Sequence, residues 1–319
     1  MSKIHVGVSS CLLGHKVRFD SGHKHNRFIT NKLSDYFEFR PFCPEVNIGL
    51  EVPREPIRLV TSNSAKERQK NVRCVGTKNS KLDVTDSLKK SAIEQRRWLA
   101  NLSGYIVKKD SPSCGMERVK LYRNDFPERT GVGIFIQQVM SDFPNLPIEE
   151  EGRLCDPRLR ENFISRVFIY DRWKKMVESG LTWKSFYHFH AQHKFILMSH
   201  SQNKARALGK QLAQSDKADI QATAEAYITE LMSILKIVAT QKNHTNALQH
   251  MAGFMRKRLD EIDRGVLKET IDSYRKGFIP LVVPIILLKS FLIKYNQNYL
   301  EQSLYLSPYP NELALRNHL

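Results

Sequence analysis

The sequence has few cysteines and no Cys-x-x-Cys pair. Its 319 residues contain only 5 cysteines, an odd number scattered widely along the chain. A disulfide scaffold has many more cysteines for its length, and a structural zinc site usually takes four ligands, often in two close pairs. The composition therefore excludes a disulfide scaffold and argues against structural zinc. In a reducing compartment, free thiols in turns fit metal binding or catalysis better.

Long apolar runs are also lacking. The longest apolar stretch, residues 278–293, is cut by Pro280, Pro284 and Lys289, whereas a membrane-spanning helix needs about 20 consecutive apolar residues. The first residues run directly into a strand-like stretch instead of a secretory signal. No internal repeat or low-complexity tract occurs. We therefore expect a soluble, cytoplasmic protein that makes no membrane contact.

Acidic residues are scarce relative to basic ones. The formal net charge is +17. Lys and Arg minus Asp and Glu gives 26 − 18 = +8 for residues 1–155 and 24 − 15 = +9 for residues 156–319. The excess of basic residues is therefore not confined to one tail, because both halves of the chain carry it. This distribution favours a partner with a phosphate backbone, and hence nucleic acid.

The length and the periodicity predict two domains. A chain of this size is too long for one ordinary compact core. Strand-like stretches alternate with a helix at residues 87–102, capped by Thr85, up to about residue 150. We expect an α/β domain at residues 1–155, Rossmann-like with a largely parallel sheet, and an all-α domain at residues 156–319. Helices of the second domain are expected at residues 158–178, 183–199, 204–214, 220–240, 246–275 and 281–295.

Three cysteines organise the first domain. Cys11, Cys43 and Cys114 each lie in a turn rich in Ser, Pro or Gly. Each follows a stretch typical of a strand, at residues 5–9, 37–42 and 105–107. If these strands are parallel neighbours, the three thiols meet at the carboxyl edge of one sheet, where α/β folds keep their sites.

Three thiolates from separate strand ends suit a 4Fe–4S cluster in which one iron has no protein ligand. Two other interpretations stay open: a single catalytic cysteine served by a histidine, or three ordinary buried residues. Cys74 has no turn signals around it and is predicted to be a half-buried structural cysteine.

Two polar residues accompany the cysteines. Glu45, two residues after Cys43, could act as general base or acid. Ser111, three residues before Cys114, could donate a hydrogen bond to a developing anion. The alternative makes Glu45 a surface carboxylate and Ser111 a turn former. Arg54 and Arg58 are further candidates for phosphate or base contacts.

The motifs Ser10-Cys11-Leu12-Leu13-Gly14, Cys43-Pro44-Glu45 and Ser111-Pro112-Ser113-Cys114-Gly115 resemble the thiouracil desulfidase family over about residues 4–150. The second half resembles the helical domain fused to that family, through Phe189-His190-Ala191-Gln192-His193-Lys194, Tyr274-Arg275-Lys276-Gly277 and Tyr305-Leu306-Ser307-Pro308-Tyr309-Pro310.

This resemblance implies an enzyme in which Cys11, Cys43 and Cys114 hold a 4Fe–4S cluster and Glu45 and Ser111 take part in catalysis. The implied reaction removes sulfur from 4-thiouridine in tRNA by non-redox hydrolysis, giving uridine and hydrosulfide. Residues 1–155 would then be the catalytic desulfidase domain and residues 156–319 the tRNA-binding domain.

The helical domain offers a compact basic cluster of Arg256, Lys257 and Arg258, which we interpret as tRNA backbone contacts. His190 and His193 share a helix face, but without a nearby acidic residue they fit buried or RNA-contacting histidines better than metal ligands.

Two alternative functions remain at this point. The first is a desulfidase of free thiouracil or thiouridine nucleotides. The second is a non-catalytic iron–sulfur RNA-binding protein that senses redox state, which Glu45 disfavours because a sensor needs no base. The sequence sets no oligomeric state.

Overall fold

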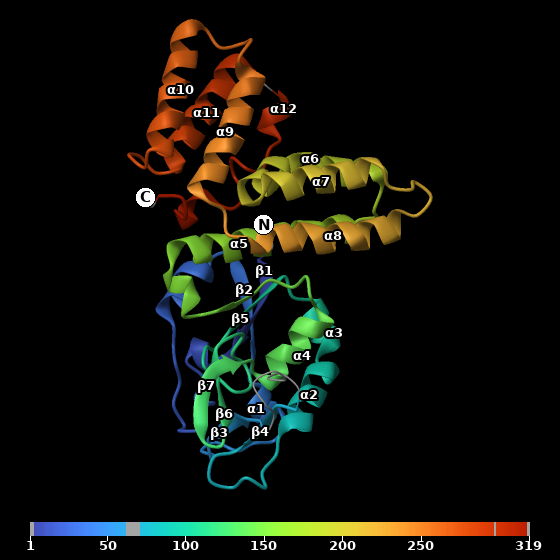
Figure 1. The fold of residues 1–319 in the computed structure, drawn as a ribbon, viewed down its shortest axis with the longest axis vertical. Coiled ribbons are helices and arrows are strands. Elements are labelled where there is room, and N and C mark those ends of the chain that lie inside the picture. The colour runs from blue at the N-terminus through green and yellow to red at the C-terminus, as the bar shows by residue number, and fades with distance from the viewer. Residues whose placement is uncertain (1–2, 62–70, 297, 318–319) are drawn as a thin grey trace. The chain divides into compact units, whose positions relative to one another are not determined.

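The computed structural model describes residues 3–61, 71–296 and 298–317. The chain divides into two compact units, Met1–Cys155 and Asp156–Leu319. Figure 1 shows the first unit with strands and helices and the second with helices alone among its described residues. This arrangement confirms the predicted fold class of an α/β domain followed by an all-α domain.

The central sheet of the first unit is entirely parallel. Its strand order is β2-β1-β5-β8, with bounds Phe37–Phe42, Ile4–Ser9, Gly104–Val107 and Ile148–Glu150. Val6 of β1 pairs with Phe39 on one side and with Gly104 on the other. Every residue of β5 is buried, as is usual for a parallel strand covered on both faces. The three predicted strands are therefore neighbours, as expected.

Helices α2 (Thr85–Glu94), α3 (Arg96–Ala100) and α4 (Ile134–Asp142) belong to this unit, as does the short α1 (Pro44–Asn47). The single helix expected at residues 87–102 is wrong, because α2 ends at Glu94 and α3 begins at Arg96. Thr85 is the first helical residue instead of the cap. Its hydroxyl and its N–H both donate to Asp83 Oδ1.

A second sheet of the first unit was largely missed. Its order is β4-β3-β6-β7, with bounds Arg73–Gly76, Ile57–Val60, Val119–Arg123 and Phe126–Gly131. Strand β3 runs parallel to β6, while the two outer pairs are antiparallel. Cys74 lies in β4 and is completely buried, not half-buried. Residues 61–81 are polar and basic, a composition that predicts a flexible segment, and they lie partly outside the described residues, which do not include 62–70.

The second unit consists of helices in its described residues. They are α5 (Pro157–Glu178), α6 (Trp183–His200), α7 (Gln202–Ala213), α8 (Ile220–Lys236), α9 (Gln241–Met255), α10 (Glu261–Arg275), α11 (Val282–Tyr295) and α12 (Asn298–Glu301). The single helix expected at residues 246–275 is wrong, because Asp260 caps a new helix by accepting a hydrogen bond from the Asp263 N–H at 2.8 Å.

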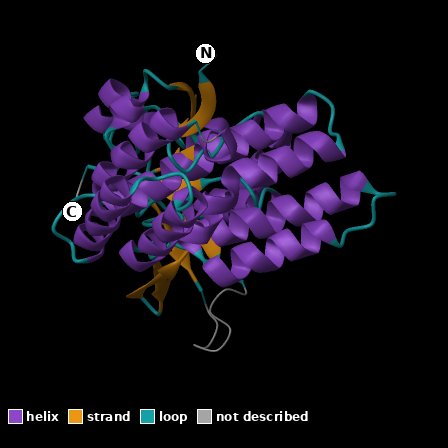
Figure 2. Cartoon of the chain, turned by 90° about the horizontal axis from the view of Figure 1, so that it is seen from above, coloured by secondary structure: helices purple, strands orange, loops and turns teal. Residues whose placement is uncertain are grey.

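One apolar core holds these helices together. Trp173 of α5, Phe186 of α6 and Leu231 of α8 are among its buried members, and Figure 2 draws the helices in purple. Burial of such side chains contributes about 1.5–3 kcal/mol each. Among the described residues, no helix has both the length and the apolar character needed to cross a bilayer.

Candidate active site

The three cysteines line one cavity at the carboxyl edge of the parallel sheet. β1 ends at Ser9 before a 3₁₀ turn with Cys11, β2 leads into Cys43, and the segment after β5 brings Cys114 to the same edge. The cavity has a volume of about 590 Å³. Its lining includes all three cysteines together with Glu45 and Ser111, so the structure brings every predicted residue of the first domain's site together.

Backbone contacts fix the turn that carries Cys114. The first residues of α4 donate hydrogen bonds to this turn, from the Ile134 N–H to Pro112 O at 3.0 Å and from the Ile136 N–H to Ser113 O at 3.2 Å. Gly133 permits this approach, because a Cβ there would lie 2.6 Å from the Ser113 carbonyl. The glycine is therefore needed for close packing of the turn against α4.

Burial keeps the cavity's thiols protonated in the absence of a bound metal. Burial, with a smaller contribution from Cys43, raises the pKa of Cys11 to about 11. Burial also raises the pKa of Cys43 and that of Cys114. Nucleophilic cysteines instead have a lowered pKa, so the interpretation as a single catalytic cysteine gains no support from this environment.

The donor set fits an iron–sulfur cluster better than a single ion. Within residues 3–61, 71–296 and 298–317, no three Cys, His, Asp or Glu side chains gather closely enough to bind one metal ion. A 4Fe–4S cluster would not need the thiolates of Cys11, Cys43 and Cys114 to surround one ion, and thiolates are its usual protein ligands.

Tyr105 adds an independent observation. Its side chain is fully buried, and its hydroxyl has no hydrogen-bond partner among the described residues. Burial and the neighbouring Cys114, Cys43 and Cys11 raise the pKa of Tyr105 well above its usual value. A buried donor without a partner needs an explanation, and a cluster between the cysteines would supply sulfide acceptors. The residues therefore fit the cluster.

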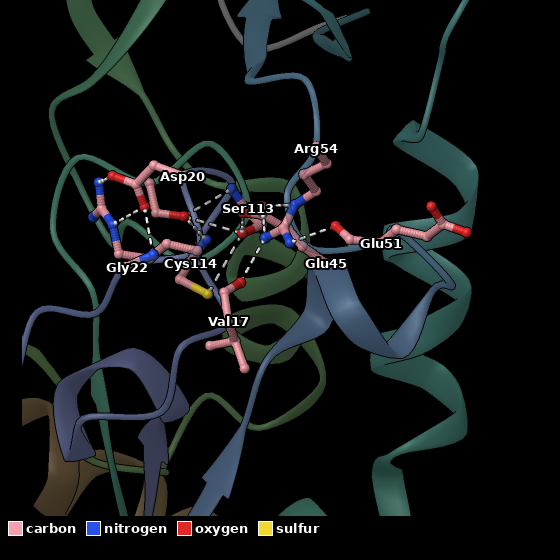
Figure 3. Close-up of polar contacts among 10 residues, drawn as sticks. Val17, Asp20, Gly22, Glu45, Glu51, Arg54, Ser113 and Cys114 are labelled. Atoms are coloured by element: carbon pink, nitrogen blue, oxygen red, sulfur yellow. Dashed lines mark hydrogen bonds and ion pairs between the residues drawn. The ribbon is translucent and has the colours of Figure 1, made fainter.

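Glu45 is held by two neighbours (Figure 3). Arg54 donates to Glu45 Oε2 from Nη2 at 2.7 Å and from Nε at 3.1 Å. The Ser113 hydroxyl donates to Glu45 Oε1 at 2.7 Å. The Arg54 and Glu45 side chains are only 7% and 14% exposed, and removing one partner of such a buried pair costs about 3–5 kcal/mol. Glu45 is thus no surface carboxylate.

Ser111 reaches Glu45 through Ser113. The two hydroxyl oxygens lie 3.0 Å apart, and the Cys114 N–H donates to Ser111 Oγ at 3.2 Å. Arg54, Glu45, Ser113 and Ser111 therefore form one continuous chain of polar contacts. Ser113 was missed by the sequence analysis although it stands within the Cys114 motif. Arg54 was expected to contact phosphate or base, but its guanidinium is engaged with Glu45.

Cations surround the cavity. Arg58 is 3.0 Å from Asp125 and lies over the Tyr122 ring, while Arg18 is 3.2 Å from Asp20. Among the described residues, Lys24 and Lys120 form no ion pair. The basic residues that line the cavity are Arg18, Lys24, Arg54, Arg58, Lys108, Lys109 and Lys120, against the acidic Glu45 and Asp110. The cavity therefore favours an anionic ligand.

The basic cluster of the second unit follows α9 directly. Arg256, Lys257 and Arg258 are all exposed. Arg258 Nη1 donates to Tyr295 O at 3.2 Å and to Asn296 O at 2.9 Å, at the carboxyl end of α11. Arg258 thus has a structural contact, whereas Arg256 and Lys257 project from the turn without ion pairs among the described residues.

Two known families match separate parts of the chain. Residues 6–151 match the family described as 2-thiouracil desulfurase. Residues 194–310 match a family described as a protein of unknown function (DUF1722). The first match covers the described cavity, and the second lies within the helical unit.

Individual proteins resemble the chain as well. The uncharacterized protein YbgA of Escherichia coli strain K12 is 28% identical over 161 residues, which are 50% of this chain and 95% of that protein. The uncharacterized protein YbbK of Bacillus subtilis strain 168 is 31% identical over 110 residues, 34% of this chain and 71% of that protein. A solved structure, the 4Fe–4S-dependent thiouracil desulfidase TudS, is 25% identical with a TM-score of 0.37, covering 48% of this chain and 93% of its own.

Proposed function

We propose that this protein, which belongs to the 2-thiouracil desulfurase family through residues 6–151, is an iron–sulfur desulfidase that converts 4-thiouridine in tRNA to uridine. Cys11, Cys43 and Cys114 hold the 4Fe–4S cluster. The observation that carries the proposal is the cavity in which three thiols from three strand ends face the chain of Glu45, Ser113 and Ser111.

The reaction is a hydrolysis and needs no oxidant or reductant. Water adds through its oxygen to the thiocarbonyl carbon, the carbon–sulfur bond breaks, and both water protons end on sulfur, so that hydrogen sulfide leaves and a carbonyl remains. When bound, the cluster would supply an iron without a protein ligand, a Lewis acid soft enough to favour sulfur. Glu45 is the base that takes the first proton from water.

The serine pair connects this base to the rest of the cavity. A proton on Glu45 Oε1 can pass through the Ser113 hydroxyl to Ser111, because the successive oxygens are 2.7 Å and 3.0 Å apart. Ser111 then donates to the developing anion on the substrate. Arg54 keeps Glu45 oriented throughout, since it occupies the other carboxylate oxygen.

Ser113→Ala tests this relay. We expect the turnover number to fall by about 10²-fold, the lower range for a positioned proton-transfer group, with unchanged iron content. Ser87→Ala, at an exposed serine of α2, is the matched control and should leave activity intact. A Ser113→Ala enzyme with normal turnover would remove Ser113 from the mechanism.

The surroundings of the cavity support a nucleotide substrate over a free base. The surplus of basic side chains suits the phosphates of a nucleic acid, as does the charge of +9 on residues 156–319. Because structured RNA buries many of its bases, the target base must be exposed before reaction.

Anaerobic incubation of the reconstituted full chain with thiolated tRNA tests the function. We expect the absorbance of 4-thiouridine to disappear from tRNA much faster than from the free nucleoside at equal concentration. Faster loss from 2-thiouracil or free thiouridine nucleotides would favour the alternative substrate. Binding of tRNA without loss of sulfur from any substrate would favour a redox sensor.

Arg256→Ala combined with Lys257→Ala tests the RNA surface. We expect weaker tRNA binding, with a salt dependence that becomes shallower by about 0.7–0.9 for each phosphate that the variant no longer neutralises. Arg258 is kept because it donates to the end of α11. Lys89→Ala with Lys90→Ala, on exposed positions of α2, removes the same charge elsewhere. Equal weakening by both pairs would indicate a general charge effect.

A further inference from the structure

The helical unit contains a cavity of its own. Its volume is about 390 Å³, and every lining residue lies between Arg158 and Arg316. The walls come from α5, α6, the start of α9 and the residues before it, the end of α10 and the segment after it, and the chain near residue 316. The cavity is therefore separate in sequence from the cysteine site, which is lined by residues 9–122.

One of the helical domain's motifs lines this cavity, and another contacts residues of its wall. Tyr274 and Gly277 line it directly. The motif at residues 305–310 supplies two tyrosines. The Tyr305 hydroxyl is 2.9 Å from His244 Nδ1, and the Tyr309 hydroxyl donates to Glu161 at 2.8 Å. The desulfidase reaction uses none of these residues.

A buried arginine forms the charged part of the wall. Arg316 is 8% exposed, and it donates from Nε to Glu161 Oε1 at 2.7 Å and from Nη1 to Tyr305 O at 2.6 Å. Glu161 is thereby neutralised. Arg158, exposed in the first turn of α5, is a second cation on the lining. Arg316 balances the charge of Glu161, and Arg158 then leaves the lining of the cavity with a net positive charge.

His200 adds a neutral hydrogen-bond acceptor to the lining. Its Nδ1 donates to Ile237 O at 2.5 Å, which leaves Nε2 as an acceptor. Burial lowers the pKa of His200 to about 4, so the ring is neutral at pH 7. The lining thus combines cationic donors with a neutral acceptor, as a ligand with both a phosphate and a polar ring would require.

We propose that this cavity binds a nucleoside monophosphate unit, with the phosphate at Arg158 and Arg316 and the base near His200. A lone phosphate would leave most of the volume empty, whereas a nucleotide suits a cavity of this size. Guanidinium groups are the preferred partners of phosphate oxygens. The inference does not rest on the proposed reaction, since no residue of the cysteine site takes part.

Titration calorimetry on the full chain tests the proposal with each of the four ribonucleoside 5′-monophosphates and with inorganic phosphate. We expect saturable one-to-one binding of at least one nucleotide, clearly tighter than that of phosphate. Arg158→Ala should weaken it by about tenfold, the loss expected for one charge-assisted hydrogen bond. Arg206→Ala, at an exposed arginine of α7 outside the cavity, should leave the affinity unchanged.

Three results would overturn the proposal: no saturable nucleotide binding, phosphate binding as tight as nucleotide binding, or equal weakening by Arg158→Ala and Arg206→Ala. Because Arg158 is exposed and its side chain forms no ion pair within the described part of the chain, its replacement should not disturb folding, which the melting temperature checks. A competition experiment then distinguishes a nucleotide within tRNA from a free nucleotide as the natural ligand. If the nucleotide displaces bound tRNA, the cavity binds a nucleotide of the RNA chain. If the nucleotide binds without displacing tRNA, the ligand is a free nucleotide.

Discussion

Serine in place of Cys11, Cys43 or Cys114, one at a time, is expected to abolish both cluster binding and desulfidation. Each thiol comes from a different strand end, so no neighbouring cysteine can replace it. The activity should fall by more than the roughly 10- to 100-fold that follows removal of an outer partner of a metal site. Iron and acid-labile sulfide analysis after anaerobic reconstitution, together with the visible absorption of the cluster, measures the effect.

Cys155 provides the control for these variants. It is exposed and does not line the cavity, so Cys155→Ser should keep full iron content and activity. Cys74→Ser tests the interior instead: it should lower the melting temperature without removing iron, because Cys74 is buried in β4 away from the cavity lining. Full iron content in any of the three ligand variants would contradict the assignment of that cysteine.

Glu45→Gln is expected to reduce the turnover number by about 10²–10⁴-fold, the range for loss of a general acid–base group. The amide keeps the size of the side chain and an oxygen that can accept from Arg54, but it cannot take a proton from water. Iron content and the visible spectrum should therefore remain normal. Anaerobic turnover on thiolated tRNA, measured beside iron content, separates a catalytic from a structural effect.

Glu51→Gln is the matched control for this variant. Glu51 is exposed, and it meets Arg54 only through its backbone carbonyl, at 3.1 Å from Nη1. The replacement should leave turnover within the experimental error of the wild-type protein. A Glu45→Gln enzyme of normal turnover would assign the base to another group, and one that loses its iron would make Glu45 a structural support of the cluster site.

The sequence predicted the parallel core because its strands are apolar. Strand β5 is buried along its whole length, and β1 nearly so, which produces the apolar runs that periodicity detects. Strands β7 and β8 gave no such signal. Most of β7 is exposed, and β8 buries Glu149, which Arg153 Nε holds at 2.6 Å. The acidic residues 149–151 were interpreted as a domain edge; the boundary between the units does follow, after Cys155, but the strand β8 within this run was missed.

The partners of Glu45 could not be found by the same means. Ser113 is 68 positions away in the sequence, and only the parallel alignment of β1, β2 and β5 brings it close. Arg54 is nearer, but an arginine beside prolines gives no indication that it points towards a carboxylate. Residue type and turn chemistry located the cysteines, whereas tertiary folding determined how the carboxylate is held.

Arg54 also joins Glu45 to the segment that follows the Cys11 turn. Its Nη2 donates to Val17 O at 2.9 Å, and its backbone N–H donates to Phe19 O at 2.9 Å. Val17 and Phe19 both line the cavity. A displacement of this segment would break the bond between Val17 O and the guanidinium that orients the carboxylate, together with the bond between Phe19 O and the Arg54 backbone N–H. The segment that lines the cavity and the carboxylate that acts as proton acceptor therefore share one anchor, Arg54.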